Sequence, residues 1–388
     1  MLRVFPFIGL VFDPAVVGSL DRVTAPPYDV IGDAAERAYL KASPYNVVRL
    51  DHAQRRGSAE GYEEAGDLLR SWRRKRALVP HPEAYFAYEM RFQLDGNDRR
   101  IRGVFGALEL ESWGADVIPH ERTVPGPVED RLLLMRSTAC NVSAVYGAVA
   151  GPCPMLGDLL DDVTAKRAPL AATDEEGVQH RMWPVPVRMP ITDWLAGESL
   201  LIVDGHHRYE TALQYRDERR ARSGSGPWDR VLALVVDAGS EQLPVLPYHR
   251  IVRRTVPSSV AMGRRVLDRA TMLAELDDER LIVGVGSLAD GALVHQVLAL
   301  EGDPPAVRAL HEQVLRPDLV LDDELRFTPD AALAEDAIRR GEASTAFFLP
   351  STSTERIRAV IARGERLPQK STFFWPKPRT GMVMRPLG

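Results

Sequence analysis

The segment Asp204-Gly205-His206-His207-Arg208 most constrains what this chain can fold into and bind. It follows the apolar run 200–203, which predicts a short buried strand, and precedes residues 209–215, which predict the first turns of a helix. A helix N-terminus favours an anion such as phosphate, and a guanidinium adds charge-assisted contacts. The segment therefore predicts a phosphate-binding turn, with Asp204 placed to hold a metal ion or to orient a histidine. A capped surface turn is the structural alternative.

Length and charge limit the class of protein. At 388 residues, two or three domains are expected. The hydrophobic fraction of 45% and the charged fraction of 27% are typical of a globular protein. The formal net charge is −5 and there is no long basic stretch, which argues against nucleic acid as the main partner.

Cysteine content and hydropathy bear on the compartment. Cys140 and Cys153 match neither a disulfide framework nor zinc-ligand spacing, which favours a reducing compartment. No apolar run approaches the roughly 18 residues of a membrane span, and the first ten residues do not have the pattern of a signal peptide. We expect a cytoplasmic protein without a membrane partner. The oligomeric state stays open, a homodimer included.

Along the sequence, the spacing of apolar residues alternates between that of helices and that of strands. Residues 84–92 and 99–108 flank Asp95-Gly96 and predict a β-hairpin, and residues 62–72 predict an amphipathic helix. Residues 46–52 predict a short strand, and Thr352 with Glu355 predicts a capping box. The pattern predicts an α/β (α+β) fold with a mixed sheet. We expect residues 1–250 to form the core that carries the phosphate turn, and residues 251–388 to form a smaller C-terminal α/β subdomain.

Three further segments group side chains with chemical potential. His120-Glu121-Arg122-Thr123, followed by Glu129-Asp130-Arg131, supplies a base, an acid, cations and a hydroxyl in a proline-bounded loop, with a solvated surface loop as the alternative. Pro26-Pro27-Tyr28-Asp29 has a fixed backbone that suits the wall of a pocket or a structural turn. Lys370-Ser371-Thr372 has groups suited to phosphate. The sequence has no Walker loop and no Gly-x-Gly-x-x-Gly fingerprint, so a nucleotide would bind through a different loop.

Five segments in this order resemble the motifs of domain-of-unknown-function family 1015, and the resemblance spans nearly the whole chain. They are residues 25–31 (Ala-Pro-Pro-Tyr-Asp-Val-Ile), 120–123 with 130–131, 204–208, 246–250 (Leu-Pro-Tyr-His-Arg) and 368–374 (Pro-Gln-Lys-Ser-Thr-Phe-Phe). The Asp-Gly-His-His-Arg turn is similar to the phosphate-binding loop of the ParB/sulfiredoxin fold group, which includes free L-serine kinases. The resemblance implies a ParB/sulfiredoxin-like core with N-terminal elaborations.

The resemblance also implies a function. A small-molecule kinase of this kind transfers a phosphoryl group from ATP or ADP, with pyrophosphate also open as donor, to the hydroxyl of free L-serine with Mg²⁺. Gly205, His206, His207 and Arg208 match the loop and would hold phosphates. Sulfiredoxins carry a cysteine where His206 stands, and its absence argues against peroxiredoxin repair.

The remaining roles follow from that hypothesis. Asp204 would hold Mg²⁺, Glu121 or His120 would accept the substrate proton, and His206 would act at the transferred phosphoryl group. The substrate-binding candidates are Tyr28, Asp29, Arg122, Thr123, Arg131 and Lys370. Two alternatives stay open: a non-catalytic nucleotide-binding regulator, and a metal-dependent phosphoester hydrolase whose ions would be bound by His120, Glu121, Asp204, His206 and His207.

Overall fold

The computed structural model describes residues 1–53, 59–149, 151–253, 256, 263–316 and 324–388. Two compact units are present: unit 1 comprises Met1–Pro119, Thr123–Leu243 and Pro376–Gly388, and unit 2 comprises His120–Arg122 and Pro244–Trp375. The C-terminal segment therefore belongs to the same unit as the N-terminus. The expected domain division between residues 250 and 251 stays a prediction.

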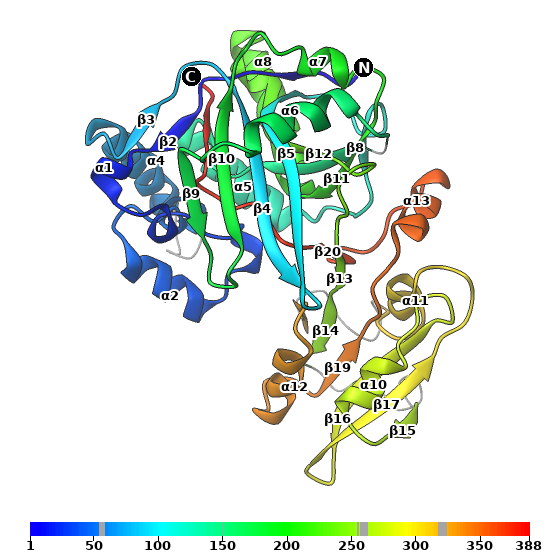
Figure 1. The fold of residues 1–388 in the computed structure, drawn as a ribbon. Coiled ribbons are helices and arrows are strands. Elements are labelled where there is room, and N and C mark those ends of the chain that lie inside the picture. The colour runs from blue at the N-terminus through cyan, green and yellow to red at the C-terminus, as the bar shows by residue number, and fades with distance from the viewer. Residues whose placement is uncertain (54–58, 150, 254–255, 257–262, 317–323) are drawn as a thin grey trace. The chain divides into compact units, whose positions relative to one another are not determined.

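Unit 1 is built on one large mixed sheet (Figure 1). β11 runs parallel to β6 and antiparallel to β8, whereas β8 runs parallel to β12. The predicted α/β class with a mixed sheet is confirmed. In spatial order the strands are β6 (Val117–Pro119), β11 (Leu200–Asp204), β8 (Val145–Val149), β12 (Arg230–Asp237), β5 (Asn97–Glu109), β4 (Tyr85–Leu94), β10 (Gln179–Val185) and β9 (Leu170–Thr173), with β1 (Val4–Phe5) also paired to β5.

The central hairpin follows from its turn residues. β4 and β5 pair in antiparallel register from Phe86 opposite Phe105 to Leu94 opposite Asn97. Asp95 and Gly96 between them have φ angles of 52° and 75°, the left-handed pair that a two-residue hairpin turn requires. The predicted hairpin is confirmed.

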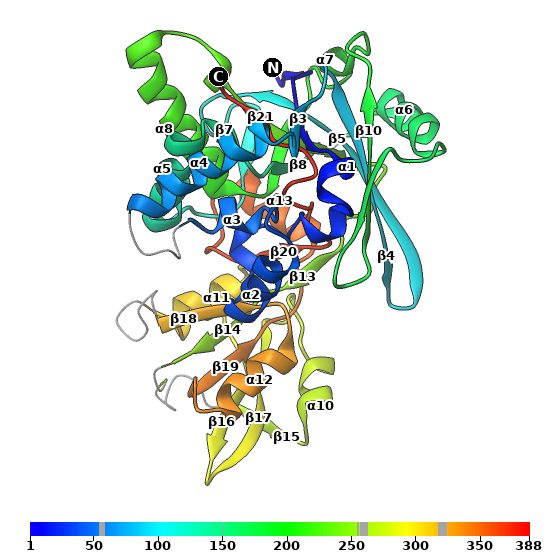
Figure 2. The ribbon, with the colours of Figure 1, turned by 90° about the vertical axis from the view of Figure 1, so that its left-hand side faces the viewer.

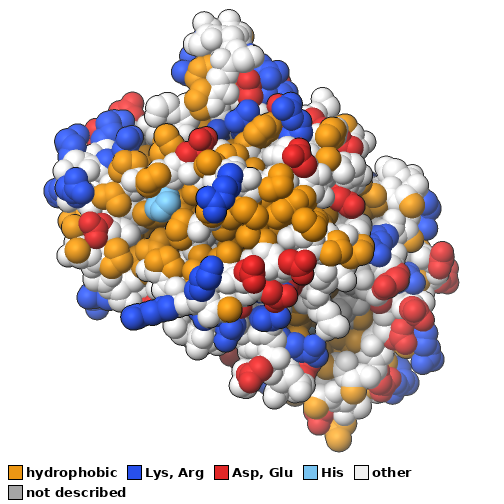
Figure 3. Space-filling view, turned by 45° about the horizontal axis from the view of Figure 1, so that its top comes forward, with side chains coloured by type: hydrophobic (Ala, Val, Ile, Leu, Met, Phe, Trp, Pro, Cys, Tyr) orange, Lys and Arg blue, Asp and Glu red, His pale blue; other side chains and the backbone are white. Residues whose placement is uncertain are grey.

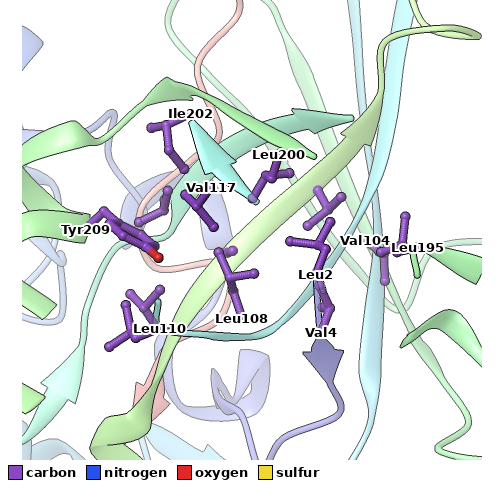
Figure 4. Close-up of a cluster of buried hydrophobic side chains, with 14 of the residues drawn as sticks. Leu2, Val4, Val104, Leu108, Leu110, Val117, Leu195, Leu200, Ile202 and Tyr209 are labelled. Carbon is purple, nitrogen blue, oxygen red and sulfur yellow. The ribbon is translucent and has the colours of Figure 1, made fainter. Parts of the chain in front are cut away.

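One face of the sheet carries the main apolar core of unit 1 (Figure 4). Alternate residues of the strands, among them Val104, Leu108, Leu200 and Ile202, point into it. Figure 4 shows Tyr209 in the same cluster. The helices that contribute are α5 (Pro125–Thr138), α6 (Pro154–Thr164), α7 (Ile191–Trp194) and α8 (His206–Ser223). The start of α8 is thus fixed by the core beneath it.

The rest of unit 1 lies in short elements. α4 (Ala59–Arg74) packs on α5, and α5 packs on α8, as Figure 2 also shows. Residues 46–52, predicted as a strand, instead contain helix α3 (Val48–Asp51), because the Asn46 side chain accepts a hydrogen bond from Val48 N at 3.0 Å and starts a turn. The other elements are α1 (Pro14–Val17), α2 (Asp33–Ala42), the pair β2 (Leu10–Phe12) and β3 (Leu78–Pro80), the pair β7 (Cys140–Asn141) and β21 (Arg385–Pro386), and the 3₁₀ turns η1 (Leu20–Arg22), η2 (Tyr28–Val30) and η4 (Pro227–Asp229).

Unit 2 has its own antiparallel sheet and core. In spatial order its strands are β15 (Arg264–Val266), β17 (Ala292–Ala299), β16 (Ile282–Ala289), β19 (Thr345–Phe348), β14 (His249–Val252) and β18 (Leu325–Thr328). Its helices are α10 (Arg269–Ala274), α11 (Ala306–Gln313), α12 (Ala331–Arg339) and α13 (Thr354–Ala362), and β13 (Val245–Pro247) pairs with β20 (Thr372–Phe374). The predicted Thr352 cap is wrong: Ser353 caps α13 by accepting from Arg356 N at 3.3 Å.

Charged and apolar side chains are mixed on one face of the molecule (Figure 3). Figure 3 shows a face on which Lys, Arg, Asp and Glu side chains lie interspersed with apolar ones. Among the helices of the described residues, none combines the length and the apolar character that crossing a membrane requires.

Candidate functional site

The turn between β11 and α8 depends on glycine. Gly205 has φ 91° and ψ 31°, a left-handed conformation that only glycine adopts readily. A Cβ at this position would also lie 2.8 Å from Nε and 2.9 Å from Cζ of Arg208, because the guanidinium packs directly on the Gly205 backbone. Gly205, the residue before α8, makes no side-chain cap hydrogen bond, and the N-terminus of a helix is a place that favours an anion.

Asp204 is the electrostatic centre of this turn. Its side chain is about nine-tenths buried and accepts from Lys377 at Oδ1 and from Arg208 at Oδ2. Arg208 also donates to the Ala144 carbonyl oxygen. Buried charges are tolerated when they are paired and hydrogen-bonded, so the three groups stabilise one another. Sequence analysis does not identify Lys377, because nothing local signals a partner 173 positions away.

The two histidines after Gly205 are held in different ways. His206 is buried, and its ring stacks on Trp113 with the centroids 6.4 Å apart. His207 Nε2 accepts a hydrogen bond from Val124 N at 3.1 Å, so a neutral His207 carries its hydrogen on Nδ1. This bond places the backbone next to Thr123 at the turn between β11 and α8.

Arg131 forms a closed network within unit 1. Its guanidinium is fully enclosed and donates to Asp51 Oδ1, to the Asp51 carbonyl oxygen and to Asp130 Oδ2, each at 2.7 Å. It also lies 3.9 Å from the centre of the Tyr28 ring. The structure thus gives Arg131 a structural task, which is to hold Tyr28 and the half-buried Asp29 beside it in η2. Substrate binding by these three residues stays a prediction.

His120, Glu121 and Lys370 lie together in unit 2. The Glu121 carboxylate accepts from the backbone N–H groups of Lys370 at 3.0 Å, Ser371 at 2.9 Å and Thr372 at 3.0 Å. His120 Nε2 lies 2.7 Å from Thr372 Oγ1. Successive backbone N–H groups that point to one place form an anion-binding concavity, called a nest, and here the Glu121 carboxylate occupies it. The Lys-Ser-Thr segment therefore binds an anion that the chain itself supplies.

Arg122 also lies in unit 2. It lines a pocket of about 280 Å³ together with Arg308, Gly364, Glu365 and Arg366. Of the predicted site residues, His120, Glu121, Arg122 and Lys370 thus belong to unit 2, whereas Tyr28, Asp29, Thr123, Arg131 and residues 204–208 belong to unit 1.

The turn, the uncapped helix and the buried ion pairs define an α/β protein with a candidate anion-binding site in unit 1. The family described as "Protein of unknown function (DUF1015)" matches residues 4–291, and the chain belongs to this family. The membership predicted from the motifs is confirmed, and the fifth motif lies beyond the matched residues. No curated protein matches the chain.

Several solved structures show a distant likeness. A free serine kinase in complex with AMP is 14% identical, with a TM-score of 0.37, covering 66% of this chain and 83% of the other. A variant of a free serine kinase in complex with ADP is 13% identical, with a TM-score of 0.38 and the same two coverages. A conserved hypothetical protein from Pyrococcus furiosus is 16% identical, with a TM-score of 0.37, covering 68% and 90%.

Removing Lys377 tests the buried ion pairs. We expect Lys377→Met to lower the free energy of unfolding by about 3 kcal/mol, because breaking a buried pair leaves a carboxylate short of one cation. Urea unfolding followed by circular dichroism measures the change. Lys41→Met, at an exposed position of α2, is the control and should stay within about 0.5 kcal/mol of the unchanged protein. Equal stability of the two variants would contradict the structural importance of the pair.

His249 makes unit 2 sensitive to acid. It is 3% exposed, and its Nδ1 accepts from Leu349 N at 3.2 Å. Burial, helped by the charge of Arg250, lowers the pKa of His249 from 6.5 to about 4. The unfolded chain therefore binds more protons between these values, so the stabilisation is complete above pH 6.5 and is lost as the pH falls towards 4.

When the pH falls from 7 to 5, this single group lowers the free energy of unfolding by about 2 kcal/mol. The variant His249→Asn keeps a hydrogen-bond acceptor but does not titrate. We expect its free energy of unfolding to fall by about 2 kcal/mol less than that of the unchanged protein over that pH range. Urea unfolding at the two pH values measures the difference, and His311, whose pKa burial lowers to about 3, contributes equally to both proteins. Identical pH dependence in both would refute the assignment.

Proposed function

We propose that the protein is a small-molecule kinase that transfers a phosphoryl group from a nucleoside phosphate to a hydroxyl. The observation that carries this proposal is the uncapped N-terminus of α8 at a glycine turn, with Arg208 and Lys377 held beside it. Phosphoryl transfer needs mainly positioning and charge neutralisation, and both are available from these groups. Free L-serine is the acceptor that the family resemblance implies, and ATP, ADP or pyrophosphate is the donor.

Each group at the turn has a task in this proposal. The first N–H groups of α8 would donate to phosphate oxygens, with the helix dipole favouring their negative charge. Arg208 and Lys377 would neutralise charge that develops in the transition state. His207 would present Nδ1–H as a further donor, because Val124 N occupies its other ring nitrogen. His206, packed on Trp113, would keep the start of the helix in place.

Asp204 does not fit the role of a resident Mg²⁺ ligand. Mg²⁺ prefers carboxylate and phosphate oxygens, whereas both oxygens of Asp204 are bonded to cationic side chains. Within the described residues there is also no group of three or more His, Cys, Asp or Glu arranged to hold a metal ion. We therefore assign Asp204 the role of holding Lys377 and Arg208, and the metal-dependent hydrolase receives no support.

The proton acceptor stays a prediction. Glu121 and His120 remain the candidates, and in the described structure their side chains hold the turn at residues 370–372. Binding of a nucleotide without turnover is the second candidate function. The specific observation in its favour is that the turn offers donors and cations for phosphate, whereas both oxygens of its one carboxylate, Asp204, are engaged.

A kinase assay tests the proposal. Purified protein is incubated with Mg²⁺, L-serine and ATP, ADP or pyrophosphate, and O-phosphoserine is measured by mass spectrometry. Arg208→Gln should lower product formation by about 100-fold or more, because it removes a charge at the transferred group. Arg220→Gln is the matched control: Arg220 is on the same helix, is exposed and pairs with Asp229 at 2.7 Å.

Each outcome of the assay has a meaning. Product that is lost in Arg208→Gln and retained in Arg220→Gln supports a kinase with its site at this turn. Normal turnover in a folded Arg208→Gln variant would place the chemistry elsewhere. No product with any donor, together with nucleotide binding measured by calorimetry, would favour the non-catalytic alternative.

A further inference from the structure

A pocket of about 690 Å³ lies in unit 1 beside the turn of the β4–β5 hairpin. Its volume is within the range of about 300–1,000 Å³ that is typical of sites for small molecules. Residues of β4 and β5, with others at the start of β10, line this pocket. None of the described lining residues belongs to the turn between β11 and α8, so the pocket is a separate candidate site.

Positive charge predominates among the side chains that line the pocket. Three of them are arginines, Arg91 from β4 and Arg99 and Arg100 from β5. Asp98 is the one carboxylate among the described lining residues, and it accepts a hydrogen bond from Gln93 Nε2 at 2.9 Å. Three arginines and one carboxylate leave an excess of two positive charges, which attracts an anion and repels a cation.

Two of these arginines lie directly opposite each other. Arg91 in β4 pairs with Arg100 in β5, and Gln179 in β10 pairs with Arg91 on its other side. Directly opposite residues share a face of the sheet with Cβ atoms about 5 Å apart, and like charges in this arrangement destabilise the pair. The side chains of Arg91 and Arg100 are 48% and 49% exposed, so an anion from solution can reach both.

The next row of the same sheet shows how a carboxylate stabilises such arginines. Glu89 lies opposite Arg102 on β5 and opposite Arg181 on β10, so one carboxylate stands between two arginines. It is fully buried and accepts from Arg181 Nε at 2.8 Å. In that row the chain itself supplies the anion, whereas the row that contains Arg91 and Arg100 has none. A ligand with an acidic group would supply it there.

The two opposed guanidinium groups have hydrogen-bonding capacity left. Arg91 donates from Nε to Glu89 Oε1 at 2.7 Å, and Arg100 Nη2 lies 3.5 Å from Asp161 Oδ1. Asp161 also accepts from Arg102, so its charge is shared. Because a guanidinium has five N–H donors, several donors of each group have no partner among the described residues. Such donors match the oxygens of a carboxylate or a phosphate group.

We propose that this pocket binds a small polyanion with two or more carboxylate or phosphate groups, one of which Arg91 and Arg100 bind together. Arg99 supplies charge for a second group, because its partner among the described residues, Gln242 Oε1 at 2.9 Å, is neutral. Carboxylate and phosphate share the oxygen geometry that guanidinium groups recognise. This site goes beyond the proposed function, since it requires neither a nucleotide nor phosphoryl transfer.

Calorimetry with two probes tests the proposal. Citrate offers carboxylates without phosphate, and pyrophosphate offers phosphates without carboxylate. We expect the unchanged protein to bind at least one of them, and Arg100→Gln to weaken that binding about tenfold, because hydrogen bonds to a charged group are lost. Arg91→Gln should weaken it by a similar factor. The melting temperature of each variant shows whether it is folded.

Arg70→Gln is the matched control. Arg70 is on α4, its side chain is 57% exposed, and it pairs with the exposed Asp67 at 2.7 Å. This substitution changes the net charge of the protein by the same amount as Arg100→Gln, but Arg70 does not line the pocket. Both dissociation constants should therefore stay within twofold of those of the unchanged protein.

The outcomes decide both the site and its ligand. Weakening that affects citrate alone identifies a carboxylate ligand, and weakening that affects pyrophosphate alone identifies a phosphate ligand. Failure of both anions to bind, or affinities within twofold in the pocket variants, overturns the proposal. Equal weakening in Arg70→Gln also overturns it, because binding would then follow net charge alone. If Arg91→Gln does not fold, Arg100→Gln decides, since the Asp161 side chain that it pairs with is 61% exposed.

Discussion

The buried carboxylate of Asp204 is the constraint on which the candidate site depends. It joins the end of β11, the first turn of α8 and the C-terminal segment through its bonds to Arg208 and Lys377. A carboxylate enclosed by protein is tolerated only when it is paired, so the two cations cannot leave without a large loss of stability. The same pairing holds the guanidinium against Gly205, where a Cβ would lie 2.8 Å from Arg208 Nε. The charges are thus in place before any ligand arrives, which is the condition under which they stabilise a developing anion most effectively.

Local features of the site could be predicted from the sequence, whereas its long-range partners could not. The strand at residues 200–204, the glycine turn and helix α8 follow from hydrophobic period and residue type, and so does the β4–β5 hairpin from Asp95-Gly96. Lys377 has no local signal, because it meets Asp204 only when the C-terminal segment returns to unit 1. Tyr146 is similar: it is one apolar-looking residue of a buried strand until a bulge in the neighbouring strand sets Asp204 opposite it. The strand predicted at residues 46–52 is wrong, because the Asn46 side chain accepts a hydrogen bond from the backbone and starts a turn that leads into helix α3.

Residue type alone does not show which interactions a side chain already makes in the folded chain. His120, Glu121 and Lys370 form a set that suits acid–base chemistry or phosphate binding, yet Glu121 is the acceptor for three successive backbone N–H groups around Lys370. Arg131 is a candidate for carboxylate binding on charge, yet Asp51, Asp130 and the Tyr28 ring surround its guanidinium. In both cases the chain supplies the counter-ion itself. A sequence shows which groups are able to bind an anion, but only the folded structure shows whether that ability is already used.

The balance between satisfied and unsatisfied groups therefore separates structural from functional polarity in unit 1. Arg131, Glu241 and Tyr88 form hydrogen bonds within the protein, and their networks stabilise the fold. At the end of β11 the situation is reversed: α8 begins without a side-chain cap, two cations share one carboxylate, and a buried hydroxyl on the adjacent strand has no partner among the described residues. The paired charges stabilise the free protein, whereas the buried hydroxyl without a described partner destabilises it. Under the proposed function, these cations, held in place before a ligand binds, would contribute to the recognition of a phosphoryl group.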